Sequence, residues 1–159
     1  MKHSTVFIMV FITLVFSGSA FAQGKPDFSG TWTLDTAKSD MGQGRPSAQA
    51  ATRTVTVVIK QTPAVLVIDR KAGERVETAT LKLDGSESIN KSPSGQDIKS
   101  TSRWVGSTLV TKSMMATGEG TAEMSDVRSL SADGKVMTID MTRKTPRGDV
   151  RQKLIYNRQ

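Results

Sequence analysis

Apolar and polar residues alternate along most of the chain, and β-branched residues are frequent at these positions. In residues 52–61, for example, Val55, Val57 and Ile59 share one face and polar residues share the other. A period of two is typical of strands that bury one face, whereas the period of an amphipathic helix is almost absent. The pattern predicts nine or ten strands, at residues 30–35, 52–61, 65–71, 76–83, 86–90, 98–105, 108–115, 121–130, 136–143 and 150–158.

The connections between these strands are short and rich in glycine. Asp84-Gly85 and Asp133-Gly134 indicate tight hairpins, because the favoured two-residue turn needs positive φ at both central residues. Residues 36–51 are the exception, and we expect a long loop there with one helical turn near residues 37–41. Short sequential hairpins favour an all-β, up-and-down antiparallel β-barrel of about 8–10 strands over a sandwich. A barrel of that size has room for one small ligand.

The segment that precedes the strands differs in character. It has a positively charged start, an apolar run at residues 6–16 and the small-residue sequence Ala20-Phe21-Ala22. These features are typical of a cleaved signal peptide, and the run is shorter than the roughly 20 residues of a membrane-spanning helix. We therefore expect a signal peptide at 1–22, cleaved after Ala22, and one domain at 23–159. The protein would be secreted or periplasmic, with no stable membrane anchor.

Four segments carry a family resemblance. They are residues 26–39 with Gly30-Thr31-Trp32, then 102–110, 130–139 and the closing 154–158. In this order they resemble secreted bacterial lipocalin-like (calycin-type) β-barrel proteins, most of which have no assigned activity. The resemblance implies a lipocalin-like barrel with a ligand cavity.

The layout is also similar, more distantly, to that of fatty-acid-binding proteins. Those proteins typically hold the ligand carboxylate with an Arg two residues before the Tyr of the last strand. Here Leu154 stands two residues before Tyr156, so the usual clamp is not reproduced at that position.

Several chemistries are excluded by composition. The chain has no Cys, and its one His, His3, lies in the predicted signal peptide. A Ser-His-Asp or Cys-His nucleophile is therefore ruled out, and we expect no metal site and no cofactor. Carboxylate pairs near turns are interpreted as solvated hairpin residues, so we do not expect an enzyme, although a carboxylate-based isomerase-like activity stays open. The net charge is +7, but basic residues are scattered and aromatic residues are few, which argues against nucleic-acid binding.

Candidate ligand-binding residues are Arg103, Trp104, Arg128 and Tyr156. An Arg that faces the interior is costly unless paired, so it would imply an anionic ligand or an internal carboxylate. Asp126 and Asp140 are the candidates for that carboxylate. The family resemblance implies that Trp32 packs at the closed end of the barrel against a cation of the last strands, for which Arg151, Lys153 and Arg158 are available.

These features favour a secreted or periplasmic binding protein that holds a small apolar or amphipathic molecule in its barrel cavity. We expect it to act as a monomer. The alternative is a protein-interaction or inhibitor module with a solid barrel, in which the loop at 36–51 and the basic surface contact a partner.

Overall fold

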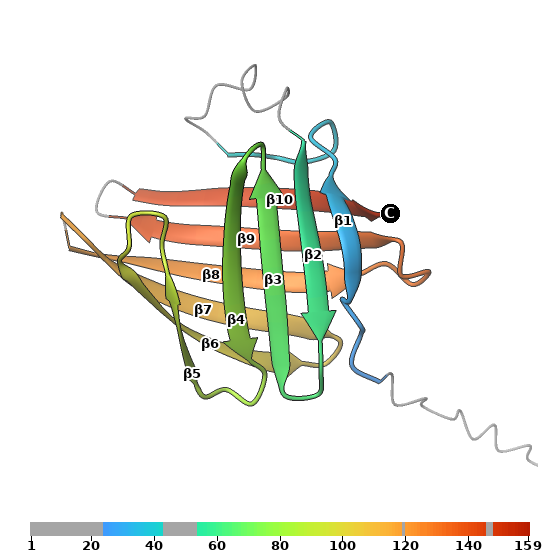
Figure 1. The fold of residues 1–159 in the computed structure, drawn as a ribbon, viewed down its shortest axis with the longest axis horizontal. Helices are drawn as coiled ribbons and strands as arrows, with labels where there is room; N and C mark the ends of the chain where they lie inside the picture. The colour runs from blue at the N-terminus through green and yellow to red at the C-terminus, as the bar shows by residue number, and fades with distance from the viewer. Residues whose placement is uncertain (1–23, 43–53, 119, 146–147) are drawn as a thin grey trace, which may run out of the picture.

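The computed structural model describes residues 24–42, 54–118, 120–145 and 148–159, and the predicted signal peptide lies outside this part of the chain. The described residues form ten β-strands and no helix, which confirms the predicted all-β, up-and-down architecture (Figure 1). The strands are β1 (Gly30–Leu34), β2 (Val55–Gln61), β3 (Val65–Ala72), β4 (Arg75–Lys82), β5 (Glu87–Lys91), β6 (Asp97–Val105), β7 (Thr108–Thr117), β8 (Gly120–Leu130), β9 (Val136–Thr145) and β10 (Gly148–Arg158).

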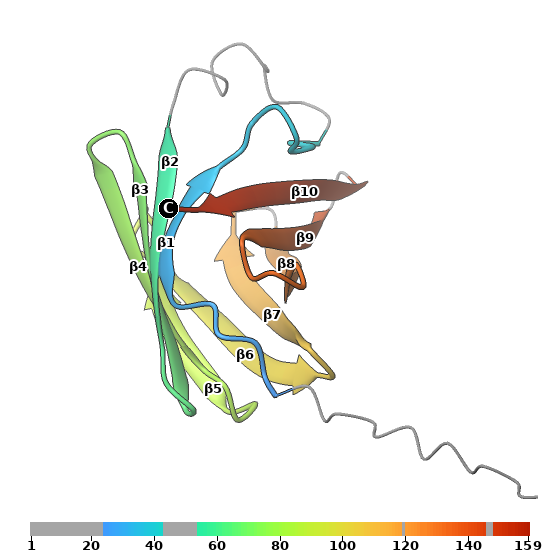
Figure 2. The same cartoon turned by 90° about the vertical axis from the view of Figure 1, so that its right-hand side faces the viewer.

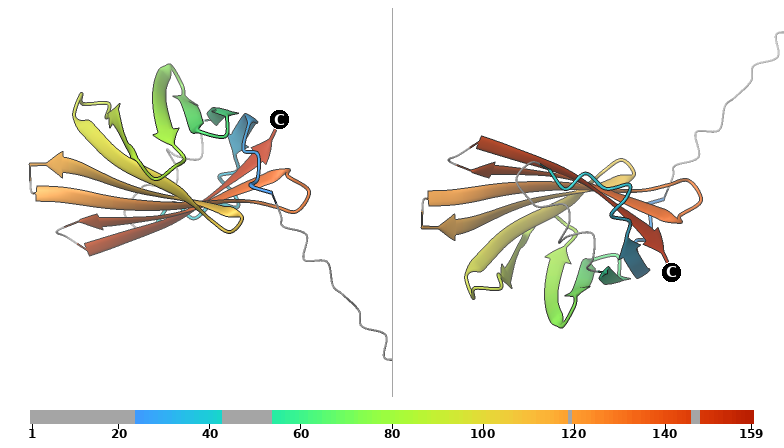
Figure 3. Two further views of the ribbon diagram at one scale, coloured as in Figure 1. Left: turned by 90° about the horizontal axis from the view of Figure 1, so that it is seen from below. Right: turned by 90° about the horizontal axis from the view of Figure 1, so that it is seen from above.

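All ten strands belong to one antiparallel sheet with the order β4-β3-β2-β1-β10-β9-β8-β7-β6-β5. The first and last strands are neighbours, with Trp32 opposite Arg158 and Leu34 opposite Tyr156. This pairing curls the sheet around on itself and brings its two edges, β4 and β5, to face each other (Figures 1 and 2). The result is a nearly closed, lipocalin-like barrel, and Figure 3 shows the curled sheet from below and from above.

The tight turns follow the sequence signals only in part. Gly85 and Gly134 have positive φ, but Asp84 and Asp133 do not, so the predicted turn with positive φ at both central residues is wrong at both sites. The Asp84-Gly85 turn also joins β4 and β5, which do not pair, so it closes no hairpin. In the predicted long loop, Ser39 N–H donates to the Asp35 carbonyl at 3.1 Å, which forms a single turn after β1. The chain then runs along β10, where Asp40 and Lys153 exchange two backbone hydrogen bonds of 2.8 Å. This segment brings residues 39–42 beside the barrel interior.

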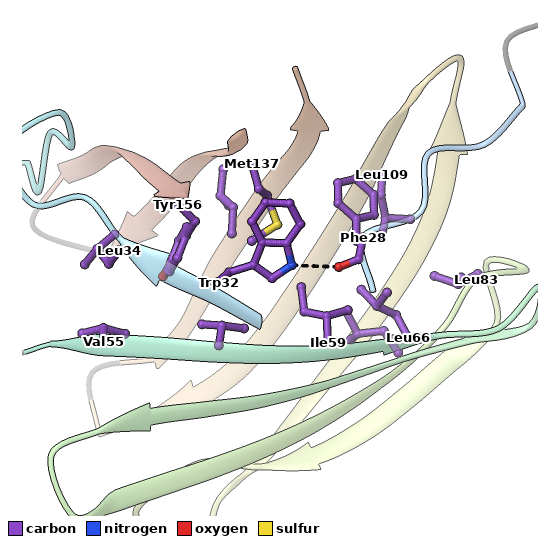
Figure 4. Close-up of a cluster of buried hydrophobic side chains, with 13 residues drawn as sticks. Phe28, Trp32, Leu34, Val55, Ile59, Leu66, Leu83, Leu109, Met137 and Tyr156 are labelled. Atoms are coloured by element: carbon purple, nitrogen blue, oxygen red, sulfur yellow. Dashed lines mark hydrogen bonds between the residues drawn. The ribbon is translucent and has the colours of Figure 1, made fainter. Parts of the chain in front are cut away.

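The hydrophobic core fills one end of the barrel, which we call the closed end (Figure 4). Its fully buried side chains include Phe28, Trp32, Leu66, Leu109 and Met137. The indole Nε1 of Trp32 donates to the Phe28 carbonyl at 2.9 Å, so the largest core residue has its polar atom satisfied. The side chains at the closed end therefore form a packed plug across the barrel.

Arg158 seals the closed end from outside. Its guanidinium lies 4.3 Å from the centroid of the Trp32 ring and donates to the backbone carbonyls of Ser29 (2.6 Å), Asp27 (3.2 Å) and Gly134 (2.9 Å). The expected contact between Trp32 and a cation of the last strand is thus confirmed, and Arg158 supplies the cation.

Candidate functional site: the barrel cavity

A cavity of about 700 Å³ occupies the other half of the barrel. Cavities of this size are typical of small-molecule sites. Much of its wall is apolar and comes from strands on both sides of β1, because every second residue of each strand faces inward. This apolar wall includes Val57, Ile59, Ile68, Ile139, Met141 and Leu154.

Charged residues interrupt the apolar wall on two sides. On the β3–β4 side, Glu77 lies 3.0 Å from Arg75 and 3.8 Å from Arg70. On the opposite side, β8 contributes Asp126 and Arg128, and β9 contributes Arg143, a cavity-lining residue opposite Met124 of β8. The lining therefore holds four guanidinium groups and two carboxylates, an excess of positive charge inside an otherwise apolar cavity.

Arg128 is the least satisfied of these groups. It is only 8% exposed, and its one ion pair is a 3.5 Å contact between Nη2 and the carboxylate of Asp126. Its Nε and Nη1 atoms are buried and have no hydrogen-bond partner. A buried donor without a partner is destabilising, and most such groups in folded proteins are paired. The donor set that Arg128 presents is suited to an anion that enters the cavity.

Tyr156 on β10 lies near two of the arginines. Burial raises the pKa of its phenol above the usual value of 10.0, while the positive charges of Arg70 and Arg128 oppose that rise. These two arginines come from opposite sides of the barrel, β3 and β8, and both act on the same phenol. A neutral hydroxyl and two guanidinium groups thus converge on one region of the cavity.

Asp126 is the internal carboxylate beside this region. Burial raises the pKa of Asp126 above 3.8, and the opposing effects of Arg128 and Arg143 do not offset it. The ionised form of Asp126 is therefore only weakly stabilised by its neighbours. Asp126 consequently leaves most of the hydrogen-bonding capacity of Arg128 free.

Hydroxyl groups on the inner face of β6 and β7 differ from Arg128 in having hydrogen-bond partners. Ser102 and Thr111 hydrogen-bond to each other at 2.9 Å, and Ser100 and Ser113 do so at 2.8 Å. Each pair consists of opposite residues on adjacent strands. These hydroxyls satisfy one another. Among the described residues, the buried side-chain donors without a partner are Trp104 Nε1, at the closed end, and Arg128 Nε and Nη1, in the cavity.

The four residues singled out from the sequence are not brought together. Arg128 and Tyr156 line the cavity. Arg103 is exposed on the outer face of β6, since its neighbours Ser102 and Trp104 face inward. Trp104 lies at the closed end, where its ring stacks on Phe28 with centroids 5.9 Å apart. Of the two candidate carboxylates, Asp126 lines the cavity and Asp140 is exposed.

Arg70 is the residue that sequence reasoning missed. It alternates with Leu66 and Ile68 in β3, and this alternation already placed it on the inner face. The position two residues before Tyr156 is occupied by Leu154, so the second guanidinium near the phenol comes from a distant strand. A search limited to the last strand could not find it.

The described residues lack two features. They contain no group of three or more His, Cys, Asp or Glu side chains placed to hold a metal ion. No helix in the same part of the chain is long and apolar enough to cross a membrane.

Comparison with known proteins supports the fold. No family model matches the chain, and no curated protein matches its sequence. Among solved structures, the chain is similar to the fatty acid transporter REP1-NXSQ, with 20% identity and a TM-score of 0.60 over 82% of this chain and 95% of the other. It is also similar to human cRBP IV, with 19% identity and a TM-score of 0.62 over 84% and 99%. The predicted lipocalin-like fold is confirmed, whereas the resemblance to a secreted bacterial group stays a prediction.

Proposed function

We propose that this protein is a secreted or periplasmic carrier that holds one small amphipathic molecule, with its anionic group near Arg128 and Tyr156 and its apolar part along the cavity wall. The observation that carries the proposal is the pair of unpartnered Arg128 donors in a cavity of about 700 Å³. A charged donor in a poorly solvated site gains more from an anion than it would in water.

Other observations support a carrier. Of the two similar structures, one is a fatty acid transporter, and both share the barrel of this chain. The cavity argues against the alternative of an interaction module with a solid barrel. The predicted signal peptide at 1–22 supports the location, and the composition, without Cys and with His only at position 3, supports a binding role rather than catalysis.

A matched pair of fluorescent probes tests the proposal. 1-Anilinonaphthalene-8-sulfonate and N-phenyl-1-naphthylamine share one ring system, and only the first carries a sulfonate. We expect the protein to bind the sulfonate more tightly, and Arg128→Met to remove that preference while it keeps binding of the neutral probe. Arg103→Met is the control, because Arg103 has the same charge on the outer face.

Equal affinity of the native protein for both probes would contradict the anionic part of the proposal. Binding of neither probe, together with no small molecule in native mass spectra of protein taken from its own compartment, would contradict the carrier itself. Fractionation of the producing cells, followed by N-terminal sequencing, tests secretion and the cleavage after Ala22.

A further inference from the structure

The barrel is closed on one side by side chains in place of a backbone ladder. β4 and β5 are the two edges of the sheet, and no register pairs them. Among the described residues, three hydrogen bonds join these strands. Asn90 Oδ1 accepts from Thr80 N–H at 2.7 Å, Asn90 Nδ2 donates to the Thr80 carbonyl at 3.0 Å, and Ser88 Oγ accepts from Lys82 N–H at 2.8 Å.

The amide of Asn90 thus takes the place of a peptide group in this seam. A peptide on a neighbouring strand would offer Thr80 one acceptor and one donor, and the Asn90 side chain offers the same pair. A side chain, however, can rotate away without any movement of the strand that carries it. Breaking the seam at this point therefore needs only a rotamer change at Asn90, whereas opening any other pair of strands needs loss of a continuous ladder.

The seam lies beside the cavity. Arg75 and Glu77 of β4 line the cavity on one side of the seam, and Ser92, Pro93 and Ser94 line it on the other. The strands lie close where the turn after β4 connects them and diverge toward the opposite end (Figures 1 and 3). On the far side of Asn90 from that turn, β4 and β5 diverge. The cavity wall there consists of residues from both edges of the sheet.

We propose that ligands enter and leave the cavity sideways, through the seam between β4 and β5, and that the Asn90 amide is the latch that closes it. The proposal rests on the proposed function for the existence of a ligand, but the latch is defined by the protein alone. Asn90 is not part of the cavity lining, so it controls the rates of ligand binding and release and does not change the affinity.

The latch is tested first without any ligand, by amide hydrogen exchange. Asn90→Ala removes two hydrogen bonds, which together correspond to roughly a 5- to 30-fold change in an opening equilibrium. We expect exchange at Thr80 N–H to accelerate by that factor. Leu81 N–H, which alternates toward β3, serves as the internal control. Asn157→Ala is the matched variant, because the Asn157 amide bonds to Asp35 away from the seam. Unchanged exchange at Thr80 in Asn90→Ala would overturn the latch.

The route is tested by stopped-flow kinetics with 1-anilinonaphthalene-8-sulfonate. Asn90→Ala should raise the association and dissociation rate constants by the same factor and leave the dissociation constant unchanged. The chain has no Cys, so paired cysteines can be bridged selectively. Val76, which is 61% exposed, lies on β4, and the exposed Ser94 lies in the turn that follows β5. Bridging Val76→Cys and Ser94→Cys with a flexible bis-maleimide should slow both rates at least tenfold.

The control bridge joins Thr101→Cys and Lys112→Cys, which are paired and exposed on the outer face of β6 and β7. If the Val76–Ser94 bridge leaves both rates unchanged while the probe still binds, the route is overturned and the carrier proposal stands. If the native protein binds neither probe and its native mass spectra show no small molecule, the carrier proposal fails, and the exchange result at Thr80 alone decides the latch.

Discussion

Arg128 is predicted to lower the stability of the empty protein while it raises affinity for an anion. Its Nε and Nη1 atoms are buried without partners, and each such donor costs about 1–3 kcal/mol. The double substitution Asp126→Asn/Arg128→Met removes these donors together with the buried carboxylate, and the Met side chain keeps apolar volume at the site. Taking the lower bound of about 1 kcal/mol for each of the two donors, we expect the free energy of unfolding to rise by about 2 kcal/mol.

The same substitution should weaken binding of 1-anilinonaphthalene-8-sulfonate. Two hydrogen bonds from a charged donor are worth about 3 kcal/mol at the lower bound, which corresponds to ~100-fold in the dissociation constant. Urea unfolding followed by Trp fluorescence measures the first quantity, provided the m-value is unchanged, and calorimetric titration measures the second. A double variant that is less stable than the native protein and binds the probe equally well would refute the reasoning.

Three further outcomes follow from the fold. Gly42→Ala should destabilise more than Gly73→Ala in urea unfolding, because both glycines have positive φ but a Cβ at Gly42 would lie 2.5 Å from a backbone oxygen, whereas none lies near Gly73; equal losses would contradict this. Arg158→Ala should lower the free energy of unfolding by about 2–3 kcal/mol through its hydrogen bonds and its contact with the Trp ring, and Arg158→Lys should recover less than half, since an ammonium lacks the planar fork. Because burial raises the pKa of Asp126, its ionisation opposes folding at neutral pH, so Asp126→Asn should gain stability over the native protein at pH 7 and lose that gain below pH 3.8. For Asp133, whose pKa is lowered mainly by the Ser131 hydroxyl, the cost of Asp133→Asn should instead shrink as the pH falls, and a pH-independent difference in either variant would contradict the assignment.

The sequence carries most of the fold because local signals and the sheet agree. Alternation located every strand within a few residues, and the short connections predicted an antiparallel order. The Asp84-Gly85 turn misled, because β4 and β5, which it joins, do not pair. The pairing of β1 with β10 follows from no local signal, since it joins the first and last strands of the chain, and it was implied only by the prediction of a barrel. The seam between β4 and β5 could not be inferred, because it depends on the distance between the two sheet edges once the sheet has curled. No local sequence signal sets that distance.

The site was only half predictable for a different reason. Alternation in residues 65–71 already placed Arg70 with Leu66 and Ile68 on the inner face. In β6 the inner face carries Ser100 and Ser102, so hydrophobicity could not tell it from the outer face that carries Arg103. Where polar side chains hydrogen-bond to each other inside the barrel, the inner and outer faces of a strand no longer differ in hydrophobicity. Sequence reasoning depends on that difference to assign the faces.

The C-terminal residues contact the segment at 27–31 at the closed end, where Arg158 donates to the carbonyls of Asp27 and Ser29, and Gln159 N–H donates to the Thr31 carbonyl at 2.9 Å. A linker from residue 159 to the segment that begins at residue 27 would therefore join the first and last strands, and the chain could be reopened at another hairpin without altering any pairing. A second protein fused at this end would also leave the cavity half of the barrel unobstructed. The architecture is thus suited to circular permutation and to use as a tethered sensor.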